Sequence, residues 1–303
     1  MVPQGLRAAI FLVALLCAAS CSYLRFPFGK NYRAGAPEIK DYEPKGSVEE
    51  IFYPGTEGPS SRRMIVYLPA GYHRDTLRRY PVLYLLHGAR GHEMAWNRNA
   101  RVWSIIDSLS SRRYCAPMIV VTPNMNQYDS DSDMDGSRRK EVPEAITEID
   151  GSLESDFCRD VVFRIDSLYR TIPDRRGRGI AGASIGGLQT MYIAASEPAL
   201  FSVVGCFSPL WRINPRRGPR NDFYSGAEER LAPLFTGDEP PAFYLMEGRF
   251  DVLHPHIRLF RQMCEEKGWK YHYYNDNGYH GWAPWRRYLT YLLQDAFPYE
   301  EFN

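Results

Sequence analysis

The sequence predicts an α/β protein with a mainly parallel central sheet covered by helices on both faces. Short apolar runs alternate with segments of helical periodicity from residue 80 to the end of the chain, and no internal repeat or linker interrupts them. Strands connected through helices form right-handed crossovers and therefore parallel sheets. The composition, 44% apolar and 24% charged over 303 residues, is typical of a globular chain with a large core. We expect one domain over residues 46–303.

The individual elements follow from two kinds of periodicity. Predicted strands are short runs of β-branched and aromatic residues bounded by Gly or Pro, at 62–69, 81–88, 117–124, 177–184, 202–208, 242–247 and 270–275. Predicted helices have apolar residues every three or four positions and cover 98–112, 153–170, 187–197, 255–268 and 283–295. The first helix has Val102, Ile105, Ile106 and Leu109 on one face, and the second has Phe157, Val161, Val162, Ile165 and Leu168.

The N-terminal segment differs from the rest of the chain. Residues 1–20 contain one cation followed by an apolar run, which is typical of an export signal and too short for a stable membrane anchor. The run ends in AASC (18–21), which resembles a bacterial lipobox and predicts a lipid on Cys21. We expect an outer-membrane or periplasmic lipoprotein, the alternative being a soluble secreted protein cut near Ala19. Residues 21–45 are predicted to form a tether.

The charge balance excludes one class of partner. Lys and Arg total 37 and Asp and Glu total 36, a net charge of +1, and loss of the signal with Arg7 leaves 36 − 36 = 0. Nucleic acids and anionic lipid surfaces require a basic excess. We expect no nucleic-acid partner, and membrane contact only through the lipid anchor.

No metal or cofactor site is predicted. Cys115, Cys158, Cys206 and Cys264 remain after export and lipidation, and they are scattered without zinc spacing and without an assignable disulfide pairing. The run DSDSDMDG (129–136) imitates the start of a calcium loop, but Val142 stands where the last ligand belongs. A solvated acidic loop is the preferred interpretation.

The strand end GASIGG (182–187) predicts a nucleophile at Ser184. A strand enters this G-x-S-x-G string and an amphipathic helix leaves it, which is the setting of a nucleophile elbow. Ser184 then lies in a strained turn, and Gly182 and Gly186 allow the strand and helix backbones to approach closely. The alternative is a Gly-rich turn with a serine that caps the helix.

A base and an acid are predicted at two later strand ends. A serine hydroxyl is a poor nucleophile without a base, and His280 lies in the loop before the final helix, as the chain order serine, acid, histidine requires. Asp251 follows the 242–247 strand and is the predicted acid, with Asp276 as its rival.

The loop after the 81–88 strand completes the predicted site. An acyl-transfer intermediate carries an oxyanion that needs two donors. The backbone N–H groups of Ile185 and Ala89 are the predicted pair, with Gly88 as a further candidate. His87 is a candidate substrate contact, the alternative being a buried histidine in a strand-ending turn.

Tryptophans near these loops form a candidate aromatic wall. Trp96 and Trp282 are interpreted as surfaces for a flat acyl group or a sugar, although either could instead anchor the core. Trp285 is assigned to the core because it begins the apolar stripe of the last helix.

Taken together, these segments resemble the esterase D and feruloyl esterase branch of the α/β-hydrolases. The resemblance covers residues 46–295 and includes GSVEEIFYPG, RRMIVYLPAGY, YPVLYLLHGARGHEMAW, GRFDVLHP and GYHGWAPWRRYL. It implies an α/β-hydrolase fold and a serine esterase without metal or cofactor, with Ser184 as nucleophile, His280 as base and Asp251 as its partner. The usual Pro-Asn-Gly is PNM (123–125) here, and a long acidic loop, 126–150, follows it, which leaves the substrate open.

We therefore expect an exported serine esterase that acts through an acyl-enzyme on feruloyl or acetyl esters of plant polysaccharides. One alternative is another ester, such as a siderophore lactone, or acyl transfer. An alternative of another class is a catalytically silent carbohydrate-binding protein on the same fold, against which the intact serine, acid and histidine argue.

Overall fold

One mixed sheet forms the centre of the molecule. The computed structural model describes residues 42–53, 62–89, 91–125, 152–211 and 226–302. Within these ranges, eight strands lie in the order β1-β2-β4-β3-β5-β6-β7-β8. Their bounds are β1 Ser47–Tyr53, β2 Arg62–Leu68, β3 Val82–Leu86, β4 Ile119–Pro123, β5 Arg178–Ala183, β6 Val203–Phe207, β7 Ala242–Gly248 and β8 His272–Asp276.

The predicted mainly parallel sheet is confirmed. Strands β3 to β8 run parallel, whereas β2 is antiparallel to both β1 and β4. The seven predicted strands are all present, but β1 was not predicted. It is an edge strand with mostly exposed or half-buried residues, so its sequence lacks the apolar run that marks a buried strand.

Helices cover both faces of the sheet. Their bounds are α2 Ala95–Ala100, α3 Val102–Ser111, α5 Ser152–Asp156, α6 Phe163–Leu168, α7 Ile185–Ser196, α8 Ala227–Leu231, α9 His254–Lys267 and α10 Trp282–Ala296. A π-helical segment, Phe157–Val162, joins α5 to α6, so the helix predicted over 153–170 is present with a wide turn in its middle. None of the helices in the described ranges is long and apolar enough to span a membrane.

The single helix predicted over 98–112 is wrong. Two helices, α2 and α3, meet at Arg101, whose φ of 54° and ψ of 47° are left-handed, and the Arg101 N–H caps α2 by donating to Asn97 O. Ala100 and Val102 on either side of the break are both fully buried. The apolar pattern therefore continues through the break, and periodicity alone could not reveal it.

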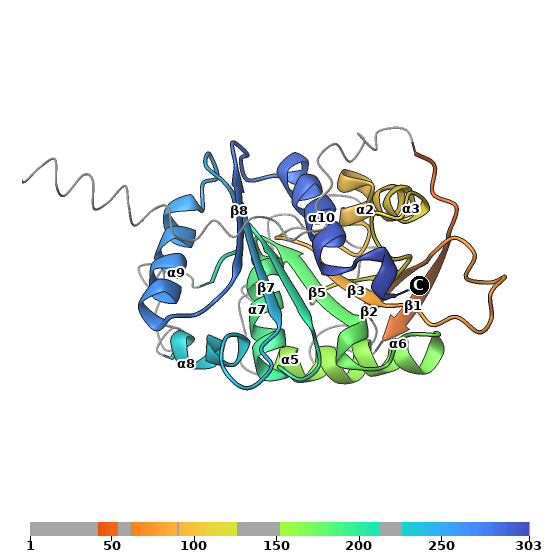
Figure 1. Ribbon diagram of the computed structural model, residues 1–303, viewed down its shortest axis with the longest axis horizontal. Helices are drawn as coiled ribbons and strands as arrows, with labels where there is room; N and C mark the ends of the chain where they lie inside the picture. Colours follow the sequence, from red (N-terminus) through yellow and green to blue (C-terminus); the bar gives the residue numbers. More distant parts are fainter. Residues whose placement is uncertain (1–41, 54–61, 90, 126–151, 212–225, 303) are drawn as a thin grey trace, which may run out of the picture.

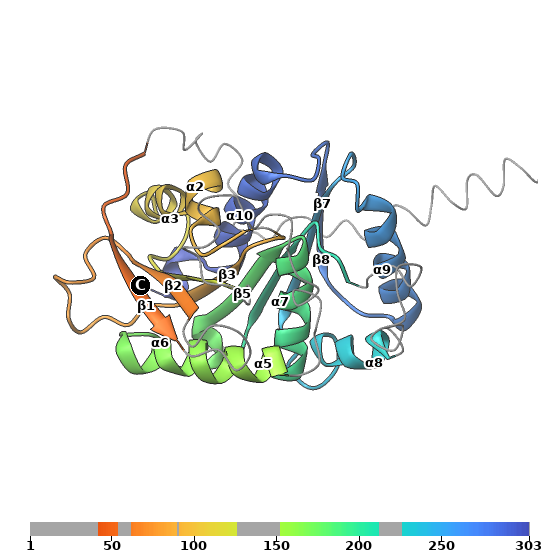
Figure 2. The same cartoon turned by 180° about the vertical axis from the view of Figure 1, so that it is seen from behind.

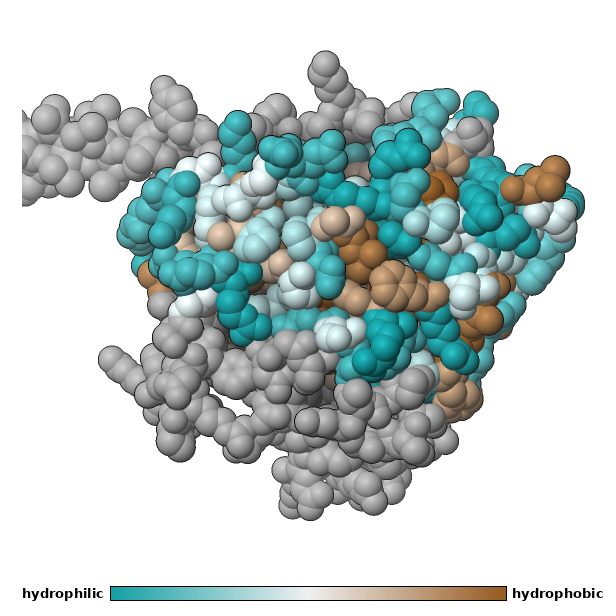
Figure 3. Space-filling model, turned by 90° about the horizontal axis from the view of Figure 1, so that it is seen from below, coloured by the Kyte–Doolittle hydropathy of each residue, from teal (hydrophilic) through white to brown (hydrophobic). Residues whose placement is uncertain are grey.

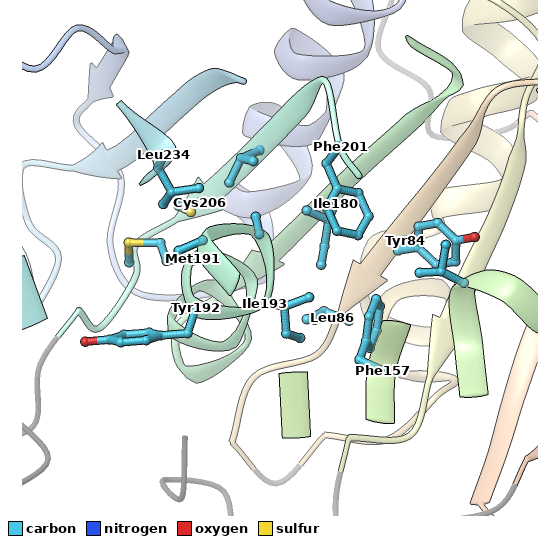
Figure 4. Close-up of a cluster of buried hydrophobic side chains, with 14 of the residues drawn as sticks. Tyr84, Leu86, Phe157, Ile180, Met191, Tyr192, Ile193, Phe201, Cys206 and Leu234 are labelled. Carbon is cyan, nitrogen blue, oxygen red and sulfur yellow. The ribbon is translucent and has the colours of Figure 1, made fainter. Parts of the chain in front are cut away.

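Alternation along the strands divides the core between the two faces. In β3, Leu83 and Leu85 face the core under α2, α3 and α10, and Tyr84 and Leu86 face the core under α5 to α9. Helix α10 lies before the sheet in Figure 1, and α7 lies before it in the reverse view of Figure 2. Figure 4 shows the second core, where side chains of the α7 helix pack against strand residues such as Ile180. The described part of the underside is mostly hydrophilic, with separate hydrophobic areas (Figure 3).

Candidate active site

Ser184 occupies the sharp turn between β5 and α7, as predicted. Its φ of 59° is positive, a conformation that costs a non-glycine residue about 1–3 kcal/mol and that marks functional turns. The turn is held by the Ser184 N–H, which donates to Phe207 O at 2.9 Å. A Cβ on Gly182 would lie 2.3 Å from Gly186 O, so the close approach predicted for these two glycines is present.

His280 lies within hydrogen-bonding distance of both other predicted residues. Its Nε2 is 3.0 Å from Ser184 Oγ, and its Nδ1 is 3.0 and 3.1 Å from the two carboxylate oxygens of Asp251. A carboxylate only accepts hydrogen bonds, so Nδ1 carries the proton and Nε2 is free to accept the serine proton. The three residues form one line of hydrogen bonds from acid to nucleophile.

Asp251 is buried, and hydrogen bonds hold it in its charged form. Burial opposes ionisation, but hydrogen bonds from His280, Ser208 and the Leu253 N–H outweigh it, so the pKa of Asp251 lies below its usual value. The Leu253 N–H donates to Asp251 Oδ1 at 2.8 Å. Asp251 is therefore a carboxylate at neutral pH.

Asp276, the predicted rival acid, makes other contacts. Its carboxylate accepts hydrogen bonds from Arg287 Nη2 at 2.6 Å, from the Tyr288 hydroxyl at 2.8 Å and from the Gly278 N–H at 2.7 Å. These partners tie the loop before α10 to the helix itself. Asp276 thus supports the loop of His280 without contacting the imidazole.

The loop that carries Asp251, the predicted acid, and the loop that carries His280, the predicted base, are paired through their backbones. We call them the acid loop and the base loop. The Arg249 N–H donates to Asp276 O at 2.8 Å, and the Phe250 N–H donates to Gly278 O at 2.9 Å, which continues the pairing of β7 with β8 beyond the strands. A Cβ on Gly248 would lie 2.0 Å from Gly278 O. This backbone pairing fixes the distance between Asp251 and His280.

The predicted oxyanion loop lies against the nucleophile. A Cβ on Gly88 would lie 3.4 Å from the Cβ of Ser184, and a Cβ on Gly186 would lie 2.4 Å from His87 O. Ala89 is exposed, and Ile185 is the first residue of α7. The two predicted donors therefore belong to segments that meet at Ser184.

This geometry coincides with a match to a known family. The Esterase family model matches residues 56–296, which is most of the chain. The protein belongs to this esterase family. The resemblance seen in the sequence is confirmed at the level of the family.

Curated relatives of this esterase are longer proteins. It is 28% identical over 167 residues to an endo-1,4-beta-xylanase/feruloyl esterase of Xylanibacter ruminicola, covering 54% of the chain and 22% of that protein. It is 25% identical over 278 residues to endo-1,4-beta-xylanase Y of Acetivibrio thermocellus, covering 84% of the chain and 23% of that protein. The chain thus spans about a fifth of the length of these relatives.

Solved structures establish the α/β-hydrolase fold. A ferulic acid esterase has a TM-score of 0.69 with 23% identity, covering 84% of the esterase and 99% of that chain. The ferulic acid esterase of the anaerobic fungus Anaeromyces mucronatus also has a TM-score of 0.69, with 20% identity over 88% of the esterase and 94% of that chain. The enterobactin esterase of Shigella flexneri has a TM-score of 0.61 with 18% identity, covering 88% of this chain and 63% of that chain.

His87 is buried and hydrogen-bonded through both ring nitrogens. Nδ1 is 2.9 Å from Gly88 O, and Nε2 is 3.0 Å from the Met125 nitrogen. Burial lowers the pKa of His87 to about 4, so the ring is neutral at neutral pH. The described partners of His87 are the two backbone groups and the Asn124 side chain, all within the esterase itself.

The predicted wall tryptophans pack edge to face against each other. Trp96 is fully buried, donates its indole N–H to Leu86 O at 2.9 Å, and packs edge-on against Trp282, with 5.2 Å between ring centroids. Trp96 therefore lies behind the predicted wall, whereas Trp282 is half-buried and lies next to the His280 loop. A substrate contact of Trp282 stays a prediction.

Two supporting residues were missed by the sequence analysis. Trp285 is buried, as predicted for the core, but its ring also meets that of His280 edge-on at 5.0 Å. Its indole N–H donates to Ser208 Oγ at 3.1 Å. Ser208 directly follows β6 and has a φ of 46°. Its place at a strand end was the available signal, but a single serine there has no motif around it.

Exposed apolar side chains flank the acid and the base. Phe250 and Val252, on either side of Asp251, are 71% and 77% exposed, and Tyr279, before His280, is 56% exposed. These three residues adjoin the predicted acid and base in the sequence and do not pack into the core.

The described residues include candidate metal ligands, whereas the predicted lipid site lies outside them. Across the described segments, no group of three or more His, Cys, Asp or Glu side chains is placed to hold a metal ion. The four cysteines Cys115, Cys158, Cys206 and Cys264 are buried and unbridged in these segments. The signal segment, the Cys21 lipid site and the acidic loop that contains DSDSDMDG lie outside the described residues.

Proposed function

We propose that the protein is a serine esterase that hydrolyses carboxylic esters through an acyl-enzyme. The observation that carries the proposal is the hydrogen-bonded line from Asp251 through His280 to Ser184 on the turn after β5. Family membership supports the same reaction class.

In the proposed first step, Ser184 Oγ attacks the ester carbonyl while His280 Nε2 takes the hydroxyl proton. Asp251 holds the ring through Nδ1 and stabilises the imidazolium that forms. The N–H groups of Ala89 and Ile185 donate to the oxyanion, and such donors contribute about 3–4 kcal/mol each. His280 then returns the proton to the leaving alcohol, and water releases the acid by the same steps.

We propose feruloyl or acetyl esters of plant polysaccharide fragments as the substrates. The names of the two xylanase relatives and of the ferulic acid esterases support this class. The exposed Phe250 and Tyr279 beside the site suit an aromatic acyl group or a sugar ring. A siderophore lactone is the second candidate, since the enterobactin esterase has the same fold.

Turnover of nitrophenyl acetate tests the reaction class. The wild type should hydrolyse it, and Ser184→Ala should reduce the rate to background. Equal rates in both proteins would reject the esterase. Methyl ferulate, acetylated xylan and a siderophore lactone then distinguish the substrates.

A pair of acid variants tests the assignment of Asp251. Asp251→Asn should lower kcat by about 10³–10⁴-fold, because the amide favours the wrong imidazole tautomer. Asp276→Asn is the matched control, since it removes a charge from the same pair of loops without touching His280. The assignment fails if Asp276→Asn is the more damaging change in a protein that remains folded.

We also propose that residues 1–20 direct export and that Cys21 carries a lipid. Cell fractionation tests the anchor, because Cys21→Ala should move the protein from the membrane to the soluble fraction. Unchanged membrane association would reject it.

A further inference from the structure

We propose that His87 is a positioning residue that orients the Gly88–Ala89 peptide so that its N–H faces the oxyanion. The proposal rests on the proposed function. It assigns to His87 a role in the reaction that requires no contact with the substrate.

The hydrogen bonds of His87 require one tautomer. Gly88 O can only accept, so Nδ1 at 2.9 Å must carry the proton. The Met125 N–H can only donate, so Nε2 at 3.0 Å must be unprotonated. Both bonds are satisfied by the neutral Nδ1–H ring, and the lowered pKa of the buried imidazole is consistent with that form.

The bond to Gly88 O determines the direction of the next N–H. In a trans peptide, the carbonyl of one residue and the N–H of the following residue point in opposite directions. Gly88 O accepts from His87 Nδ1–H and also from the Gly91 N–H at 3.0 Å, so two donors hold it on one side. The Ala89 N–H therefore points to the other side of the peptide plane.

The peptide held in this way borders the nucleophile. The Cβ position of Gly88 is 3.4 Å from the Cβ of Ser184 and 3.2 Å from Ala183 O. Rotation of the Gly88–Ala89 peptide would break both hydrogen bonds to Gly88 O and leave the buried Nδ1–H without its partner, which is unfavourable. The donor direction is thus preset before an ester binds.

The second nitrogen of His87 anchors the ring to the neighbouring strand. Met125 follows β4, and Asn124 beside it is held by the Tyr53 hydroxyl, which donates to Asn124 O at 2.7 Å. The Asn124 N–H donates to Arg63 O at 2.9 Å. The imidazole is therefore held between the ends of β3 and β4, where the Asn124 side chain also hydrogen-bonds to it.

Two amide variants separate the two nitrogens of His87. The side-chain amide of His87→Asn can place a donor where Nδ1 lies, and that of His87→Gln can place an acceptor where Nε2 lies. His87→Asn should keep kcat for methyl ferulate and nitrophenyl acetate within about 5-fold of the wild type. His87→Gln should lower kcat on the order of 10²-fold with KM within about 3-fold, because an oxyanion donor is misdirected.

The outcomes are distinguishable from a failure of the proposed function. If the wild type exceeds Ser184→Ala but the Asn and Gln variants lose kcat equally, or the Gln variant is the more active, the role of His87 is rejected and the esterase stands. Urea unfolding of both variants verifies that they are folded.

A measurement on the wild type needs no folded variant. Nitrogen NMR of the His87 side chain at pH 7 should show a protonated Nδ1 and an unprotonated Nε2. A ring protonated at Nε2 overturns the proposal.

Discussion

At the scale of single residues, the site depends on side chains whose protonation is set by burial and by hydrogen bonds. Asp251 remains charged because hydrogen bonds outweigh its burial, whereas His87 remains neutral because its burial outweighs its hydrogen bonds. The two residues lie on opposite sides of Ser184 in the chain order, and both act through fixed partners. The pKa of each lies below its usual value in the folded state, so both residues predict a folded state that loses stability as the pH falls.

His87 should make the folded state less stable in acid. Burial is the main cause of its low pKa, His92 lowers it further, and the Gly88 carbonyl and Glu93 raise it. Between pH 6.5 and about 4 the unfolded chain binds a proton that the folded chain does not, so stability rises with pH in this window. The loss between pH 7 and 5 should be about 2 kcal/mol.

Urea unfolding at both pH values measures this effect. His87→Asn, which cannot titrate, should lose about 2 kcal/mol less than the wild type over the same interval. Equal losses in the two proteins would show that His87 does not carry the proton linkage.

At the scale of elements, the sequence predicted features that have a local pattern and missed those that depend on backbone conformation or on distant contacts. The strand ends that carry Ser184, Asp251 and His280 were predictable because apolar runs and a glycine-flanked serine locate them. The break at Arg101 was not, since Ala100 and Val102 are both buried and the periodicity continues. The role of Ser208 depends on Trp285, which is distant in the sequence, so no local pattern could indicate it.

Arg101→Gly should stabilise the protein. The left-handed conformation costs a non-glycine residue about 1–2 kcal/mol, which glycine avoids. Glycine loses more conformational freedom on folding, which costs about 0.5–1 kcal/mol, so the net gain in stability should be about 0.5–1 kcal/mol. The Arg101–Glu43 ion pair, 3.8 Å apart with a largely exposed Glu43, contributes little. Chemical denaturation measures the gain. Arg101→Ala is the control, since it retains the left-handed strain and should show no gain.

Gly248→Ala should separate the acid loop from the base loop. The added Cβ would lie 2.0 Å from Gly278 O and 2.2 Å from Gly278 C, and backbone cannot move aside without breaking the pairing of the loops. We expect a loss of about 2–3 kcal/mol in stability, with a fall in kcat. Gly237→Ala is the control: nothing lies within 4 Å of its Cβ position, but its φ of 97° strains an alanine, so it should lower stability while leaving kcat unchanged.

At the scale of the whole molecule, the residues just before β1 are hydrogen-bonded to a buried carboxylate of the domain. The Lys45 and Gly46 N–H groups donate to Asp107 Oδ2 at 2.6 and 3.2 Å, and the Tyr67 hydroxyl donates to the same oxygen at 2.7 Å. This carboxylate is buried on α3, so residues 45–46 are anchored to that helix.

A chain shortened to residues 42–303 should therefore fold and retain activity. We expect a single unfolding transition and nitrophenyl acetate turnover within about 2-fold of the 303-residue chain, because no described contact of the site is removed. Shortening to residue 48 removes two partners of Asp107 and should cost about 1–3 kcal/mol. A multiphasic transition in the longer form would contradict the single domain.

The backbone pairing of the acid and base loops has a consequence for how this enzyme could change. Since main-chain hydrogen bonds set the spacing of Asp251 and His280, the side chains of Phe250, Val252 and Tyr279 beside them have no part in that spacing. These positions can therefore vary in shape and polarity while the distance between Asp251 and His280 stays the same. Substrate preference can thus change without disturbing the spacing of Asp251 and His280. Directed evolution of new ester preferences should begin at those three positions.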